Sequence, residues 1–195
     1  MILSILIATL ESRIEQFTKL EDFLNKQIAD NNLSDDVEVL YFRDDKEYPI
    51  GVKRNTLLEN ASGLFTVFVD DDDWVADDYV STIVTALKSN SNIDCLGIKG
   101  ELISEDLGNK PFIHSVHYKM YFEDANYYYR PPNHLNPIKK EIATQIKFPL
   151  KNFGEDYDWA MALLESGLLQ TEIFIDKILY YYHFAVHSSE TFGSR

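Results

Sequence analysis

The most constraining feature of the sequence is an apolar run that ends in four consecutive aspartates. Residues 64–69 read as a buried β-strand, and Asp70, Asp71, Asp72 and Asp73 follow it directly. Four carboxylates held at one edge of a sheet repel one another and raise each other's pKa. A bound cation would relieve that repulsion, and oxygen-only ligands suit Mg²⁺ or Mn²⁺ together with substrate phosphates. The run therefore predicts a metal–diphosphate site, against the alternative of an acidic cap on the next helix.

Strands and helices alternate over the first 100 residues. Apolar runs at residues 2–8, 37–42, 64–69 and 93–98 are typical of buried strands. Helices are expected over 13–30, 52–62 and 77–88, with a capping box from Ser12 to Glu15 and with Gly63 as the cap that ends the second. This order predicts an α/β fold with a mainly parallel central sheet flanked by helices. Such sheets bind ligands at the carboxyl ends of their strands, where polar clusters follow the first three runs.

The second half of the chain is less regular. Helices are expected over 138–146 and 155–166, the latter capped by Gly167, and strands over 171–175 and 178–184. Between residues 101 and 136 Tyr and His are frequent, and Arg130-Pro131-Pro132 interrupts any regular element. Because no repeat, low-complexity tract or linker divides the chain, we expect a single domain over residues 1–195 that ends in a polar tail over 188–195.

Composition limits the function classes. The chain has 195 residues, 45% of them hydrophobic, which is enough for one domain with a sizeable core. A net charge of −14 argues against holding nucleic acid by bulk electrostatics. Residues 110–153 nevertheless carry seven Lys or Arg against three acids, which suits either an anionic ligand or scattered solvated lysines. The single cysteine, Cys95, excludes a disulfide framework and a thiolate zinc site.

Targeting signals and common nucleotide motifs are absent from the sequence. The apolar start lacks a basic region and a cleavage site, and no run of about 18 apolar residues occurs, so we expect a cytoplasmic protein with no membrane span. Neither a P-loop nor a dinucleotide fingerprint is present. An EF-hand loop starting at Asp70 would need glycine and glutamate where the chain has Val75 and Ser81.

Several segments, taken in order, resemble family 2-like glycosyltransferases of the glycosyltransferase A-type (GT-A) fold. Residues 5–13, Ile-Leu-Ile-Ala-Thr-Leu-Glu-Ser-Arg, resemble the first strand and nucleotide loop of that family. Residues 51–55, 61–63 and 68–74 resemble the helix and metal strand that follow, and residues 152–159 resemble the segment with the catalytic base. Residues 130–137 look like a stretch of small glycosyltransferases from bacteria and tailed phages. The resemblance implies a nucleotide-sugar-binding half over 1–100 and an acceptor-side half over 101–187.

The resemblance also implies roles for single residues. Asp72, Asp70 and His183 would hold Mn²⁺ or Mg²⁺, while Asp73 would fix a neighbouring loop. The implied donor-binding residues are Thr9, Glu11, Arg13, Asp44, Asp45, Arg54, Asn55 and Asp71. His134, Asn136 and Trp74 would contact a sugar on the donor or acceptor side. For Lys53 and Arg54, ordinary helix-surface charges are the alternative.

A general base is needed on the acceptor side, because the attacking hydroxyl must lose its proton. Asp156 is the expected base and Glu155 the fallback, since both lie at the start of a predicted helix whose dipole favours carboxylates. The alternative is a simple helix cap.

The predicted function is metal-dependent transfer of a sugar from a nucleotide-diphosphate sugar, most directly a UDP-sugar, to an acceptor hydroxyl by one inverting displacement. A glycan, a lipid-linked saccharide, a protein and a modified nucleic-acid base all stay open as acceptors. One alternative is a sugar-phosphate nucleotidyltransferase, disfavoured because residues 9–13 contain no glycine. Another is a non-catalytic nucleotide-sugar or divalent-ion binding module, disfavoured by the Glu155-Asp156 pair.

Overall fold

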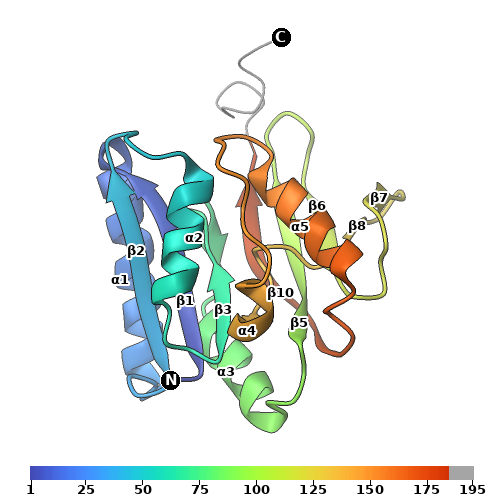
Figure 1. Cartoon of the computed structure of the whole chain (residues 1–195), viewed down its shortest axis with the longest axis horizontal. Coiled ribbons are helices and arrows are strands. Elements are labelled where there is room, and N and C mark those ends of the chain that lie inside the picture. The colour runs from blue at the N-terminus through green and yellow to red at the C-terminus, as the bar shows by residue number, and fades with distance from the viewer. Residues whose placement is uncertain (185–195) are drawn as a thin grey trace.

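One mixed sheet runs through residues 1–184, the part of the chain that a computed structural model describes (Figure 1). Its strands are β1 (Leu3–Leu10), β2 (Val37–Asp44), β3 (Phe65–Phe68), β4 (Trp74–Val75), β5 (Cys95–Ile103), β6 (Lys110–His114), β7 (Phe122–Glu123), β8 (Tyr128–Arg130), β9 (Ile138–Lys139) and β10 (Glu172–His183). They follow the order β2-β1-β3-β9-β5-β6-β8-β7, and β10 pairs with both β5 and β4. The predicted tail over 188–195 lies outside the described residues.

The N-terminal part of the sheet is parallel, as the sequence predicts. Strand β1 lies between β2 and β3, with Leu3 opposite Val37 on one side and Phe65 on the other. Residues from Leu3 to Ile7 are fully buried, because helices cover both faces of the sheet at this point. The carboxyl ends of β1, β2 and β3 therefore meet at one edge.

The remaining strands depart from the predicted parallel order. Strand β9 inserts between β3 and β5 and is antiparallel to both, so the strand expected over 93–98 does not pair with β3. The two strands expected near the C-terminus form one strand, β10, which runs parallel to β5. The register of β10 against β5 shifts between Phe174 and Ile178 and again between Ile178 and Tyr180, where the gap between the two expected strands falls.

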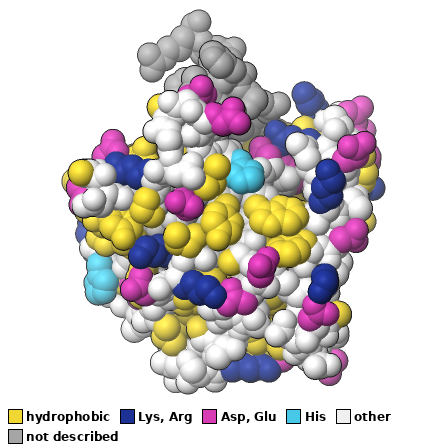
Figure 2. Space-filling view, turned by 180° about the vertical axis from the view of Figure 1, so that it is seen from behind, with side chains coloured by type: hydrophobic (Ala, Val, Ile, Leu, Met, Phe, Trp, Pro, Cys, Tyr) yellow, Lys and Arg dark blue, Asp and Glu magenta, His cyan; other side chains and the backbone are white. Residues whose placement is uncertain are grey.

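Helices cover the two faces of the sheet. They are α1 (Ile14–Asp30), α2 (Ile50–Asn60), α3 (Tyr79–Ser89), α4 (Lys140–Ala143) and α5 (Glu155–Ser166), with a short 3-10 turn, η1 (Glu11–Arg13), before α1. Helices α1 and α3 pack together on one face, and α2, α4 and α5 lie on the other (Figure 1). Seen from behind, hydrophobic side chains gather near the middle of the surface, with charged side chains around them (Figure 2). Within residues 1–184, no helix is both long and apolar enough to cross a membrane.

The core on the α2 and α5 face positions the start of α5. One buried cluster contains Leu57 of α2, Trp159 of α5 and Phe148 from the segment before α5. The Phe148 and Trp159 rings stack with their centroids 4.6 Å apart. The Trp159 indole also donates a hydrogen bond of 2.9 Å to the carbonyl of Ile146. These contacts hold the first turn of α5, and hence Glu155 and its neighbour, beside α2.

Three local predictions about the helices are wrong. No capping box forms, because α1 begins at Ile14 after η1, with no side-chain cap. Helix α2 ends at Asn60, and Gly63 instead lies against β1, where a Cβ would stand 2.6 Å from the Ser4 amide nitrogen. The helix expected over 138–146 is strand β9 followed by the single turn α4. The predicted cap at Gly167 is confirmed, with φ of 66°.

Candidate active site

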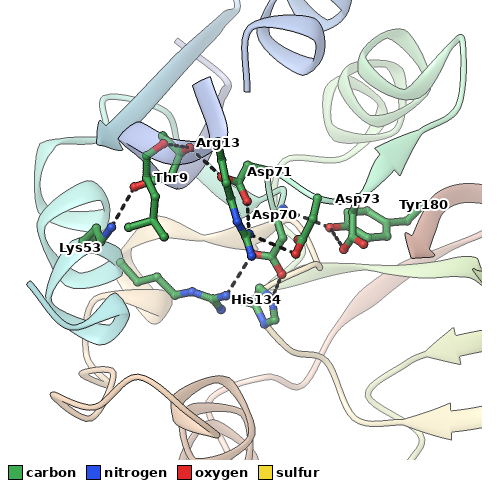
Figure 3. Close-up of polar contacts among 11 residues, drawn as sticks. Thr9, Arg13, Lys53, Asp70, Asp71, Asp73, His134 and Tyr180 are labelled. Atoms are coloured by element: carbon green, nitrogen blue, oxygen red, sulfur yellow. Dashed lines mark hydrogen bonds and ion pairs between the residues drawn. The ribbon is translucent and has the colours of Figure 1, made fainter. Parts of the chain in front are cut away.

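The acid run follows β3 at the shared sheet edge, and residues of β1 and η1 hold Asp71 there. The Thr9 hydroxyl donates to Asp71 Oδ2 at 2.6 Å, and Arg13 Nη1 donates to Asp71 Oδ1 at 2.7 Å (Figure 3). Asp71 is consequently buried. The structure thus brings together three residues predicted to bind the donor, and it uses them to fix the loop that follows β3.

Asp70 is bound on both carboxylate oxygens. Arg54 Nη2 of α2 lies 3.0 Å from Asp70 Oδ1, and His134 Nε2 lies 3.2 Å from Asp70 Oδ2. Burial alone would raise the pKa of Asp70, but the charges of Arg54 and His134 more than offset it and hold that pKa well below its ordinary value. Asp70 is therefore an ionised carboxylate that is already engaged by protein groups.

Asp73 connects the acid run to β10, as expected of a residue that fixes a neighbouring segment. The Tyr180 hydroxyl donates to Asp73 Oδ2 at 2.7 Å, and the His183 amide donates to Asp73 Oδ1 at 2.8 Å. Burial and the negative charge of Asp70 raise the pKa of Asp73 well above its ordinary value, against the hydrogen bond from Tyr180. The same Tyr180 oxygen accepts a hydrogen bond of 3.1 Å from the Asp70 amide.

Asp72 differs from its three neighbours because its side chain is 49% exposed. The Asp72 side chain contacts Arg13, whose Nη1 lies 3.1 Å from Asp72 Oδ2. Partial burial and the negative charges of Asp70 and Asp71 raise the pKa of Asp72, and the positive charge of Arg13 lowers it by less. An exposed carboxylate in a field of negative charge is a fitting ligand for a hard divalent cation that keeps several water or substrate oxygens.

The predicted metal triad is not preassembled. Within residues 1–184, no three His, Cys, Asp or Glu side chains are grouped so as to hold a metal ion. Asp70 is engaged by Arg54 and His134, and the part of His183 that reaches the acid run is its backbone amide. The residues present therefore fit a cation held by Asp72 and completed by ligand oxygens.

A buried ion pair lies next to the carboxyl end of β1. Lys53 Nζ of α2 binds Asp44 Oδ1 and donates to the Thr9 carbonyl at 2.8 Å. Asp44 Oδ2 accepts a hydrogen bond of 2.8 Å from the Tyr48 amide. Both carboxylate oxygens of Asp44, which is predicted to bind the donor, are thus engaged inside the fold, and its donor role stays a prediction. Neither Lys53 nor Arg54 is a helix-surface charge, since each is only 3% exposed.

We expect Asp44→Asn to lower the free energy of unfolding by about 3–5 kcal/mol, because it leaves the buried ammonium of Lys53 without its counter-charge. Its exposed neighbour provides the control, and Asp45→Asn should change stability by less than about 0.5 kcal/mol. Denaturant titration at neutral pH measures both. Equal effects of the two substitutions would contradict this role for Asp44.

The same pair predicts a pH dependence of stability. Burial by itself would raise the pKa of Asp44, but hydrogen bonds from Lys53 and the Tyr48 amide lower it below the ordinary 3.8. A carboxyl whose pKa falls on folding stabilises the protein above its unfolded pKa, and this is lost as the pH drops through the folded pKa. Wild type should therefore lose more stability than Asp44→Asn between about pH 5 and pH 2.

In the described part of the chain, the other residues predicted to bind the donor form no hydrogen bond or ion pair with the acid run. Glu11 is exposed and accepts a hydrogen bond of 3.2 Å from Arg43 Nε, and Asp45 is also exposed. The Asn55 side-chain amide both donates to and accepts from the backbone of Phe148 at 2.9 Å. Asn55 thus fixes the segment before α5, and its contact with a donor stays a prediction.

Glu155 and Asp156, the two carboxylates at the start of α5, differ in burial and in their partners. Glu155 is 4% exposed and lies 3.5 Å from Arg54 Nε, while Asp156 is half-buried. Burial raises the pKa of Glu155, which Arg54 opposes and Asp156 reinforces. Among the described residues, none forms a side-chain hydrogen bond or ion pair with Asp156. Of the two, Asp156 is the carboxylate available to a substrate.

The three residues predicted to contact a sugar have different surroundings. The buried side-chain amide of Asn136 accepts a hydrogen bond from the Asn133 backbone amide and donates one to the Leu96 carbonyl, at 3.0 and 2.9 Å, so it fixes its own loop. Trp74 stacks on Phe23 of α1, with ring centroids 4.8 Å apart, so it packs on the helix pair opposite α5. His134 lies in the site through its contact with Asp70, and its buried Nδ1 has no hydrogen-bond partner among the described residues.

Two contacts of the site could not be predicted from the sequence. The Arg54 guanidinium lies over the edge-to-face pair of Phe68 and Phe148, 5.5 and 5.6 Å from their ring centroids. It also connects Asp70 to Glu155. Tyr180 of β10 accepts a hydrogen bond from the Asp70 amide, and the two residues are 110 positions apart in the sequence. No local pattern marks either contact, since both depend on tertiary packing.

This sheet order and the acid edge define an α/β domain of the GT-A type. Residues 24–149, more than half of the chain, match the family described as Glycosyl transferase family 2. The chain belongs to this family. No curated protein sequence matches it significantly.

Solved structures of S. aureus TarS share the fold. The crystal structure of TarS 1–349 matches with a TM-score of 0.62 and 17% identity, covering 94% of this chain and 60% of that one. The complex of the same fragment with UDP gives 0.62 and 17%, covering 95% and 61%. The complex with UDP-GlcNAc gives 0.60 and 15%, covering 95% and 59%. The chain thus spans about three fifths of the TarS fragment, and at these identities the likeness establishes the fold.

Proposed function

We propose that this chain is a glycosyltransferase that moves a sugar from a nucleotide-diphosphate sugar, most directly a UDP-sugar, to an acceptor hydroxyl with Mg²⁺ or Mn²⁺ bound. Family membership and the TarS structures solved with UDP and UDP-GlcNAc support the donor class. The observation that carries the proposal is the arrangement of the acid run. All four of its carboxylates contact protein groups, but Asp72 is the only one of the four that is substantially exposed.

Asp72 would hold the cation, which supplies charge neutralisation at the diphosphate leaving group. Thr9, Asp71 and Arg13 would shape the wall on the nucleotide side, since they meet at the carboxyl end of β1. The Arg13 guanidinium contacts Asp71 and Asp72 and is 31% exposed, so it is placed to orient an anionic donor at that edge.

Asp156 would accept the proton of the attacking hydroxyl. A two-step retaining reaction needs a second carboxylate that acts as nucleophile. The adjacent carboxylate, Glu155, is buried against Arg54 and is not free for that part. This supports a single displacement with inversion at the anomeric carbon.

The proposal is tested by incubating the protein with a panel of UDP-, GDP-, CMP- and dTDP-sugars and Mn²⁺, and measuring nucleotide release. Slow release from one UDP-sugar, accelerated by a mixed acceptor extract, is the expected result. If no nucleotide sugar is consumed and none raises the melting temperature, the transferase function is refuted.

A further inference from the structure

An exposed aromatic side chain directly follows the proposed base. Tyr157 lies in the first turn of α5 and is 50% exposed. Its ring contacts Tyr121, with centroids 5.1 Å apart and planes at 55°. Tyr121 comes from the segment between β6 and β7, so two distant parts of the acceptor-side half meet beside Asp156. We call Tyr121 and Tyr157 the aromatic ledge.

The ledge is held in place from below. The Arg130 guanidinium of β8 lies 5.4 Å from the centroid of the Tyr121 ring, and Asn133 hydrogen-bonds the Tyr121 side chain. Burial raises the pKa of Tyr121 to about 12, with Arg130 opposing and the negative charge of Asp156 adding to the rise. The ledge is therefore a supported surface within the electrostatic reach of the proposed base.

The charges around this face do not favour a polyanion. Lys151 Nζ lies 2.5 Å from Asp158, Lys147 Nζ 2.7 Å from Glu59, and Lys110 Nζ 2.6 Å from Glu123. Lys139 Nζ also lies 3.9 Å from Glu141 Oε1, so four of the seven bases in the locally basic segment over 110–153 are paired with acids. A polyphosphate or nucleic-acid strand needs several available cations for its affinity. These lysines behave as solvated surface charges.

We infer that the aromatic ledge binds a neutral saccharide acceptor, which lays the apolar face of one sugar ring on Tyr157 and directs a hydroxyl to Asp156. Tyrosine suits this task because it combines a large apolar ring with a polar tip. Burying the C–H face of a sugar on such a ring removes apolar surface from water. The inference rests on the proposed function, since it gives Asp156 its substrate.

Saturation-transfer NMR on the whole protein with UDP and Mn²⁺ tests this inference without turnover. The probes are cellobiose, maltose, lactose and chitobiose, with a serine-containing peptide and an oligonucleotide as comparisons. At least one disaccharide should receive saturation, with the largest effect on the C–H protons of one ring face. Tyr157→Ala should weaken its binding about tenfold, and Tyr157→Phe should retain it because the ring is kept.

Tyr41→Ala is the matched control, since Tyr41 is 47% exposed on β2, away from α5. It should leave saccharide binding unchanged. Saturation of no disaccharide, saturation of the peptide or oligonucleotide only, or equal losses in Tyr157→Ala and Tyr41→Ala would overturn the inference. Saccharide binding that depends on Tyr157 without any turnover of nucleotide sugars would uphold the ledge and refute the transferase.

Discussion

Asp156→Asn is expected to reduce sugar transfer by about 10²–10⁴-fold while leaving donor affinity within about twofold of wild type. The amide keeps the size of the carboxylate but cannot accept a proton from the attacking hydroxyl. Donor affinity should persist because Thr9 and Arg13, and not Asp156, hold Asp71 of the acid run. Transfer rates measured at saturating donor and acceptor, together with donor titrations, check both parts.

Asp158→Asn is the control on the same helix turn. Asp158 is exposed and pairs with Lys151, so its loss should change transfer less than about twofold. If Asp156→Asn transfers at the wild-type rate, Asp156 is not the base. A protein that binds donor but never transfers, with or without Asp156, would be the non-catalytic binding module.

Arg54→Met is expected to lower the free energy of unfolding by about 3–5 kcal/mol. The substitution keeps an apolar side chain over the Phe68 and Phe148 rings but leaves the half-buried Asp70 and the buried Glu155 without their shared cation. Such a loss is a large part of the typical total of about 5–15 kcal/mol. Arg54→Lys should rescue only part of it, because a single ammonium cannot reproduce the planar fork that reaches both carboxylates.

The contrasting variant is Lys26→Met on the exposed surface of α1. Lys26 pairs with Asp30 in solvent, where an ion pair contributes about 0–1 kcal/mol. Denaturant unfolding of the three variants measures the difference. If Arg54→Met is as stable as Lys26→Met, Arg54 does not hold the donor and acceptor halves of the site together.

The fold and the position of the site could be predicted from patterns that are local in the sequence. The β-branched runs give β1, β2 and β3, and the acid run necessarily falls at the end of β3. The first turn of α5 could likewise be found, because Glu155 and Asp156 precede a helical pattern that ends at Gly167. These features need only the chain's own periodicity.

The partners inside the site could not be predicted, because they join residues far apart in the chain. Asn136 has a polar side chain in a Pro-bracketed loop and reads as a ligand contact, yet Leu96, 40 positions away, uses its amide. Asp44 follows a strand like the site acids, but Lys53 occupies it from the next helix. Strand β9 inserts into the sheet through only two residues, too few for a periodic signal.

The most direct test of the account is calorimetric titration of UDP-GlcNAc and related UDP-sugars into the protein, with Mn²⁺ and then with EDTA. Wild type and Asp77→Asn, which changes an exposed aspartate just beyond the acid run, should bind one UDP-sugar only when Mn²⁺ is present. Asp72→Asn should lose that binding at least tenfold, because the exposed carboxylate that would hold the cation is gone. Binding that is equal in Asp72→Asn and wild type, or absent from every variant, would contradict a nucleotide-sugar site at the acid run.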